Sequence, residues 1–189
     1  MPARASVRES LLAKLPKKKI GAELGVFRGD FSIEVLRIAD PMRFHMIDPW
    51  VSIEVGPRRA GWYGADQRTQ ADMDKIHDDV LQRFAKEVKA GTAIIHRATS
   101  EQALSEMPDG TLDWIYVDGD HSYEGALLDL RLSLTKVKPG GMICGDDYAT
   151  NGWWNGGVER ALHEFLHETG QRVIVRFLVD SQFVLDIRS

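Results

Sequence analysis

Two clusters of acidic residues follow apolar runs in the second half of the chain. The first cluster, in the motif VDGDH, contains Asp118, Asp120 and His121 and directly follows the run DWIYV. The second contains Asp146 and Asp147 and follows the run MICG. Carboxylates bind divalent cations, and a histidine can accept or donate a proton near neutral pH. These residues favour a site with metal or acid–base chemistry, provided that the fold brings them together.

The rest of the chain alternates short apolar runs with amphipathic segments. Apolar runs bounded by turn residues predict strands, and apolar residues spaced by three and four predict helices. The sequence ends in two strands joined by a tight turn near Asp180, which indicates an antiparallel hairpin. The predicted strands cover 20–24, 44–48, 93–96, 113–117 and 142–146, and the predicted helices cover about 5–15, a segment from 30, 72–89, 100–107, 122–137 and 157–169.

This alternation predicts an α/β fold with a doubly wound, mostly parallel, Rossmann-like sheet and a C-terminal antiparallel hairpin. We expect a single domain over 1–189, because the sequence shows no linker, internal repeat or low-complexity segment. Ligands of such sheets bind beyond the carboxyl ends of the strands. Four of the five predicted parallel strands end in carboxylates, so the functional site is expected at that edge.

The residues at the end of the first predicted strand indicate which class of ligand the site binds. In GAELGVFRGD the glycines Gly21, Gly25 and Gly29 are four residues apart, so the pattern G-x-G-x-x-G that approaches a pyrophosphate is missing. Glu23 would repel phosphates but suits an ammonium or sulfonium group. Asp48 follows Gly25 by 23 residues, close to the spacing of acids that bind ribose hydroxyls. S-adenosylmethionine meets these conditions; the alternative is that the glycines only permit a tight turn.

The ordered set of motifs resembles the class I S-adenosylmethionine-dependent methyltransferases. The segments that carry the resemblance are AELGVFRGDFS, MIDPW, DWIYVDGDHSYEGALLDL and KPGGMICGDDY. More narrowly, the chain is similar to a small bacterial group with DGDHSYEG followed by GGxxxxDDY, related to catechol-type and macrocin-type O-methyltransferases. The resemblance runs from about residue 20 to the terminal hairpin. It implies a seven-stranded sheet and methylation of a hydroxyl group on a small acceptor, either a sugar or a phenolic compound.

The resemblance also implies which residues bind the cofactor. Glu23 would face its amino group, Gly25 would line its methionine portion, and Asp118 would close the pocket beside the methyl group. This chain has Phe27 where the family often has a third glycine. Four further residues would hold the nucleoside, with Asp48 at the ribose, Trp50 beside it, and Thr99 and Ser100 near the adenine.

A magnesium site is predicted at the two acidic clusters. Asp118, Asp146 and Asp147 follow neighbouring strands, and three carboxylates this close raise one another's pKa unless a positive charge lies between them. Mg²⁺ prefers carboxylates and keeps sites for substrate oxygens. Related O-methyltransferases use a metal at the matching positions. The alternative is that no ion binds, with Asp118 on the cofactor side and Asp147 capping a turn.

His121 is the predicted catalytic base. It precedes a helix that Ser122 is expected to cap, and a helix N-terminus disfavours imidazolium, so we expect a neutral ring that can take the proton of an acceptor hydroxyl. The alternative is a histidine that only caps or hydrogen-bonds within the turn. Asp120 is expected to face solvent or to cap the same helix.

Composition and charge indicate which classes of partner the chain is expected to lack. The net charge of −4, with scattered Lys and Arg, lacks the basic footprint of a nucleic-acid-binding protein. No apolar run is long enough to span a membrane, and the N-terminus lacks the apolar core of a signal peptide, so we expect a cytoplasmic protein. The single cysteine, Cys144, lies in an apolar run and is expected to be a buried, inert thiol.

Two aromatic segments are candidates for the acceptor pocket. The long polar segment 51–71 is predicted to be a lid, with Trp62 and Tyr63 to bury. At least one of Trp153 and Trp154 would line the pocket mouth; the alternative is that they pack at the surface or form the contact of a homodimer.

Two other functions stay open from the sequence. The first is a nicotinamide-dependent oxidoreductase on the same kind of sheet, against which the missing glycine pattern and Glu23 count. The second is a protein that binds S-adenosylmethionine without catalysis.

Overall fold

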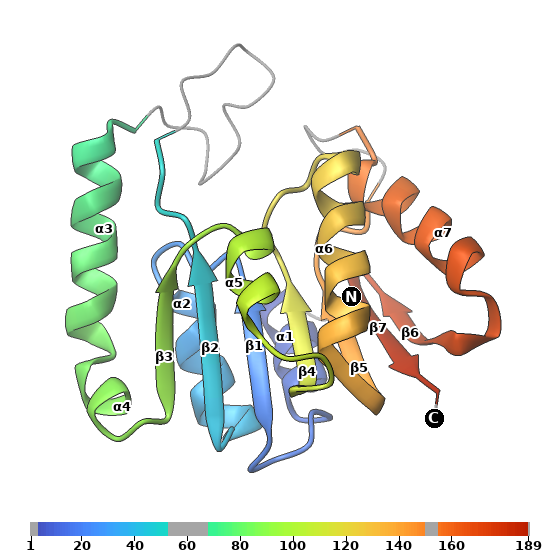
Figure 1. Ribbon diagram of the computed structural model, residues 1–189, viewed down its shortest axis with the longest axis horizontal. Coiled ribbons are helices and arrows are strands. Elements are labelled where there is room, and N and C mark those ends of the chain that lie inside the picture. Colours follow the sequence, from blue (N-terminus) through green and yellow to red (C-terminus); the bar gives the residue numbers. More distant parts are fainter. Residues whose placement is uncertain (1–3, 53–67, 150–154, 189) are drawn as a thin grey trace.

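A seven-stranded sheet forms the centre of the protein (Figure 1). The structure, a computed structural model, describes residues 4–52, 68–149 and 155–188. The strand order is β3-β2-β1-β4-β5-β7-β6; β1 to β5 are parallel, and β7 runs antiparallel to both β5 and β6. This confirms the predicted sheet and its hairpin. The strands are β1 (Ile20–Leu24), β2 (Arg43–Asp48), β3 (Ala93–Arg97), β4 (Leu112–Val117), β5 (Val137–Gly145), β6 (Val173–Val179) and β7 (Gln182–Ile187).

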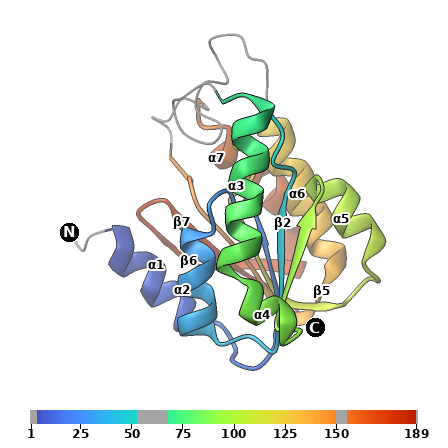
Figure 2. The ribbon, with the colours of Figure 1, turned by 90° about the vertical axis from the view of Figure 1, so that its left-hand side faces the viewer.

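Helices cover both faces of the sheet, and each face has its own apolar core (Figure 2). The first core packs α5 (Ser100–Glu106), α6 (Tyr123–Lys136) and α7 (Gly157–Thr169) on one face. The other face carries the second core, to which α1 (Arg4–Leu12), a π-helical segment at Val35–Ala39 and α3 (Gln70–Arg83) contribute. The remaining helical elements are α2 (Asp30–Glu34), α4 (Ala85–Lys89) and a 3-10 turn, Gly170–Arg172.

The sheet brings the carboxyl ends of β1, β2, β4 and β5 to one edge. Backbone hydrogen bonds continue past the strands, since the Gly25 N–H donates to the Ile47 carbonyl (2.9 Å) and the Asp118 N–H to the Leu24 carbonyl (2.9 Å). Between β1 and β4 the strand order reverses, which is the switch point where such sheets bind ligands. The residues predicted at the strand ends therefore lie side by side.

Three predicted element boundaries are wrong. The first helix, expected to reach about residue 15, ends at Leu12. The helix expected over 72–89 is divided at Phe84, whose backbone (φ −104°, ψ 16°) leaves the helical region, and it begins earlier because Thr69 and Asp72 cap α3 reciprocally. The last parallel strand begins at Val137 rather than at 142. Leu112 pairs with Val137 and Trp114 with Met142, so residues 138–141, which include the Pro-Gly-Gly stretch, form a bulge in β5 that has no partner in the β4–β5 pairing.

Other expectations concern single residues and membrane insertion. Cys144 is buried, and its burial raises the pKa of the thiol, in agreement with an inert side chain.

Within the three described ranges, no helix has the length and apolar character needed to cross a bilayer.

A pair of histidines joins β2 to β3 on the face that carries α5. His45 Nδ1 lies 2.9 Å from His96 Nε2, and the rings stack at 5.2 Å. Burial, together with the charges of His96 and Arg43, lowers the pKa of His45 to about 4. The unfolded chain takes up a proton near pH 6.5 while folded His45 resists protonation, so stability falls as the pH drops from about 6.5 towards 4.

We predict that His45→Phe flattens this pH dependence. The variant keeps an aromatic ring on β2 but removes the group whose pKa changes on folding. Urea unfolding at pH 7.5 and at pH 5 should show a smaller loss of unfolding free energy for the variant than for the parent protein. An equal loss in both proteins would contradict the assignment.

Candidate functional site

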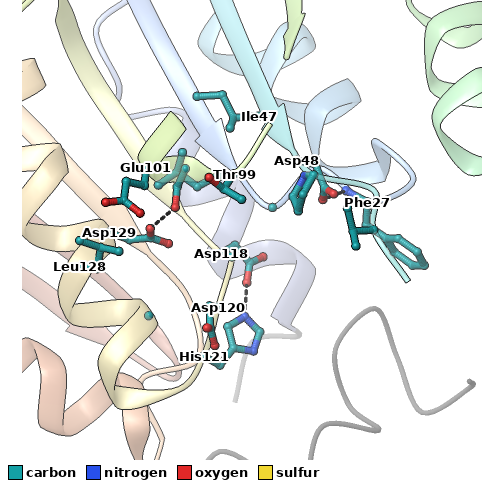
Figure 3. A pocket seen from close by; sticks show the side chains of 17 residues that line it. Phe27, Ile47, Asp48, Thr99, Glu101, Asp118, Asp120, His121, Leu128 and Asp129 are labelled. Atoms are coloured by element: carbon teal, nitrogen blue, oxygen red, sulfur yellow. Dashed lines mark hydrogen bonds and ion pairs between the residues drawn. The ribbon is translucent and has the colours of Figure 1, made fainter. Parts of the chain in front are cut away.

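A cavity of about 590 Å³ opens at the carboxyl edge of the sheet (Figure 3). Apolar side chains such as Leu24, Ile47 and Leu128 form part of its wall. Six of the residues predicted from the sequence also line it: Gly25, Asp48, Thr99, Ser100, Asp118 and His121. Four others do not, namely Glu23, Trp50, Asp146 and Asp147.

Gly25 lets β1 and β4 approach closely at the base of the cavity. Its φ is +91°, and a Cβ atom built there would lie 2.0 Å from the carbonyl oxygen of Asp118. A side chain would therefore clash with the backbone of the neighbouring strand end. The turn continues through Phe27, also left-handed at φ 49°, which explains why the related proteins often have glycine at this position.

Asp48 is held in a fixed orientation by backbone groups. Its Oδ2 accepts the N–H of Phe27 (2.9 Å) and its Oδ1 accepts the N–H of Trp50 (2.8 Å). Each carboxylate oxygen has a second lone pair, so Asp48 can accept further hydrogen bonds from a ligand in the cavity. The two backbone donors thus fix the carboxylate at the wall of the cavity.

Trp50 supports the turn instead of lining the cavity. Its ring is fully buried, and its Nε1–H donates to the Phe27 carbonyl (2.8 Å). Trp50 itself is not among the residues that line the cavity, and its predicted place beside the ribose stays a prediction. The tryptophan positions Phe27, which does line the cavity.

Glu23 does not line the cavity either. Side chains alternate along β1, so Glu23 points away from Ala22 and Leu24 and towards α2, where it accepts the Ser32 hydroxyl (2.6 Å). Burial raises the pKa of Glu23 to about 8, despite the hydrogen bond from Ser32. The carboxyl is absent from the cavity wall, and its predicted contact with the amino group of the cofactor stays a prediction.

Thr99 and Ser100 lie at the start of α5, and Ser100 contacts Asp129, a residue of the cavity that was not predicted from the sequence. Thr99 caps the helix reciprocally with Gln102, and the Ser100 hydroxyl donates to Asp129. Asp129 lines the cavity although it is 3% exposed, and burial, partly offset by Ser100, raises its pKa to about 7. Its position among the apolar residues of the 122–137 helix was the available signal, because an isolated acid on a buried helix face is rare.

His121 lies between two carboxylates. Its Nε2 is 3.3 Å from Asp118 Oδ1 and 3.4 Å from Asp147 Oδ2. Burial alone would lower the pKa of His121, but the hydrogen bond and charge of Asp118, with the charges of Asp147 and Asp120, raise it overall. The neighbouring acids thus outweigh the effect expected of the helix terminus, and the pKa of His121 rises rather than falls. Ser122 caps α6 as predicted, and Asp120 accepts the Ser122 N–H.

Asp146 forms an ion pair with the side chain of Arg8, a pairing that the sequence did not indicate. Its Oδ2 forms an ion pair with Arg8 of α1, and its Oδ1 accepts the Ser181 hydroxyl and the Asp147 N–H. Arg8 also lies 3.2 Å from Asp118 Oδ2. Among the described residues, Asp118, His121 and Asp147 offer ligand atoms that lie within 4.8 Å of one another, and this group shares Asp118 and Asp147 with the predicted cation site but contains His121 in place of Asp146.

The predicted acceptor segments lie outside the described residues. These are Trp62 and Tyr63, with most of the predicted lid, and Trp153 and Trp154.

The comparison with protein families decides the identity of the fold. A methyltransferase domain family matches residues 22–148, which includes the turn at Gly25 and both acidic strand ends. The chain belongs to this methyltransferase family. Its resemblance to the class I S-adenosylmethionine-dependent methyltransferases is confirmed, and the nicotinamide-dependent alternative is set aside. No curated protein matches the chain.

Solved structures of methyltransferases share the fold over the whole chain. The O-methyltransferase TomG from Streptomyces achromogenes, in complex with S-adenosylmethionine, has 19% identity and a TM-score of 0.66, with coverage of 100% of this chain and 81% of that one. An O-methyltransferase from Bacillus cereus in complex with S-adenosylhomocysteine has 15% identity, a TM-score of 0.65 and coverage of 100% and 82%. A putative rRNA methylase from Clostridium thermocellum has 10% identity, a TM-score of 0.68 and coverage of 100% and 97%.

We predict that Asp48→Ala weakens S-adenosylmethionine binding. Hydrogen bonds to a charged group contribute about 1.5–3 kcal/mol each, so the dissociation constant should rise about tenfold or more. Calorimetric titration measures the change, and circular dichroism checks that the turn anchored by Asp48 still folds. Asp79→Ala, an exposed acid of α3, is the matched control and should bind as the parent does. Equal affinity of Asp48→Ala and Asp79→Ala would remove Asp48 from the site.

Proposed function

We propose that this methyltransferase transfers the methyl group of S-adenosylmethionine to a hydroxyl oxygen of a small acceptor, a sugar or a phenolic compound. The observation that carries the proposal is the position of His121, which lines the cavity and is flanked by Asp118 and Asp147. A proton acceptor thus lies in the wall of a cavity suited to the cofactor. The fold shared with two O-methyltransferases that bind S-adenosylmethionine or its product supports the same conclusion.

The cavity fits the cofactor in size and chemistry. Its volume of about 590 Å³ falls in the usual range of small-molecule sites. Ile47 and Leu128 offer apolar surface for the adenine, near Thr99 and Ser100, and Asp48 offers acceptors for the ribose hydroxyls. Asp118 lines the cavity together with Gly25, so its carboxylate would face the positive charge of the methionine portion.

His121 would take the proton that the acceptor hydroxyl loses. As the acceptor oxygen forms its bond to the methyl carbon, the carbon–sulfur bond breaks, and S-adenosylhomocysteine leaves as the second product. Asp118 and Asp147 would then stabilise the imidazolium form of His121. Their charges raise the pKa of His121, so the neutral ring is a stronger base than an isolated histidine.

A divalent cation can be accommodated at the same place. Asp118, His121 and Asp147 each offer one ligand atom, and these atoms lie within 4.8 Å of one another. Mg²⁺, the predicted cation, prefers oxygen ligands, whereas an imidazole with two carboxylates also suits Mn²⁺ or Fe²⁺. A bound cation would supply positive charge that lowers the pKa of the acceptor hydroxyl. His121 would then be a ligand rather than the base.

We predict that a hydroxylated compound stimulates release of S-adenosylhomocysteine and that His121→Asn lowers kcat. General-base catalysis contributes about a hundredfold or more, so a loss of that order is expected. The dissociation constant for S-adenosylmethionine should stay within about threefold of the parent value, because the histidine acts on the acceptor.

A panel of sugars and phenols, with and without their hydroxyl groups blocked as methyl ethers, provides the assay. His167→Asn, an exposed histidine of α7, is the matched control. Methylation of a nitrogen or carbon atom, or full activity of His121→Asn, would contradict the proposal. Binding of S-adenosylmethionine without any turnover across the panel would favour the non-catalytic alternative.

The role of the cation has a separate test. After exhaustive chelation we predict reduced turnover, which Mn²⁺ or Mg²⁺ restores in the parent but not in Asp147→Asn. The variant keeps the size of the side chain while removing one charged ligand. Full turnover of the chelated enzyme, unchanged by either ion, would show that no cation takes part.

A further inference from the structure

Arg8 places a positive charge of the protein itself between the two acidic strand ends. It comes from α1, at the start of the chain, and reaches the carboxylates of both Asp118 and Asp146. We propose that Arg8 is a positioning residue that sets how tightly a divalent cation binds at Asp118, His121 and Asp147. The inference rests on the cation site of the proposed function and assigns its regulation to a residue of the N-terminal helix.

The surroundings of Arg8 hold its guanidinium in place. The Asp146 side chain has no exposed surface, and Ser181 and the Asp147 N–H occupy its other oxygen. The Phe31 ring lies 5.1 Å from the guanidinium carbon, in the geometry of a cation–π contact. A quarter of the Arg8 side chain remains exposed, so the charge adjoins solvent rather than being isolated in the core.

Asp118 connects Arg8 to the candidate cation ligands. One of its oxygens lies 3.2 Å from Arg8 Nη2, and the other lies 3.3 Å from His121 Nε2. A cation bound to Asp118 would therefore have the guanidinium on the opposite oxygen of the same carboxylate. The two positive charges repel, and this repulsion weakens cation binding.

Arg8 also determines which carboxylates are available. While it is paired with Arg8, Asp146 contributes no ligand to the group formed by Asp118, His121 and Asp147. Loss of the guanidinium removes the repulsion and frees one oxygen of Asp146 for a cation or its bound water. Both effects strengthen cation binding, whereas a purely structural role of Arg8 in docking α1 would not change it.

The test measures Mn²⁺ binding without acceptor, by electron paramagnetic resonance of the free ion. We expect Arg8→Gln to bind Mn²⁺ about tenfold or more tightly than the parent, since a unit charge next to a ligand is removed. Arg8→Met keeps a long side chain against Phe31 and should agree with Arg8→Gln. Arg8→Lys keeps the charge and should stay within about threefold of the parent.

Arg37→Gln is the matched control, because Arg37 pairs with Glu9 of α1 and with Glu34 but not with the acidic strand ends. It should leave Mn²⁺ binding unchanged. Equal Mn²⁺ affinity of the parent and both neutral Arg8 variants, whether all bind or none does, would overturn the proposal. Titration of each variant with S-adenosylmethionine checks the cofactor site separately, so a failure of the proposed methyl transfer is distinguishable from a failure of the role of Arg8.

Discussion

The close approach of β1 and β4 at Gly25 is the constraint on which the site depends. The absent side chain leaves room for the Asp118 carbonyl, which lies where a Cβ atom would be. This approach places the Gly25 turn next to the acidic end of β4, at the point where the strand order reverses. Asp48 and Trp50 then fix the turn from the β2 side through Phe27. The shape of this part of the cavity wall therefore depends on the backbone conformation of the turn.

Charge balance is the second requirement of this edge. Several carboxyl groups meet there, and each is accommodated in a different way. Glu23 is buried, which raises its pKa, while Asp146 pairs with Arg8. Asp118 and Asp147 share His121, whose pKa they raise. Burial and local cations thus divide similar residues into structural and chemical roles, as is common where titratable groups gather in an active site.

The sequence predicts the sheet and six of the residues that line the cavity, because both follow from local patterns. Apolar periodicity defines the strands, and the parallel order brings residues such as Asp48 and Asp118 to one edge. Side-chain direction is harder to predict, and the sequence alone did not indicate that alternation along β1 turns Glu23 towards Ser32 of α2. Arg8 could not be predicted, since it lies 110 residues from Asp118 in the chain and no local motif marks it.

The most direct test of the account is a crystal structure of the protein with S-adenosylhomocysteine. The account predicts the product in the cavity at the carboxyl edge, with both ribose hydroxyls donating to Asp48. The adenine should lie near Ser100, and the sulfur beside Gly25 and Asp118. Binding at another place on the protein, or in this cavity with the ribose turned away from Asp48, would contradict it.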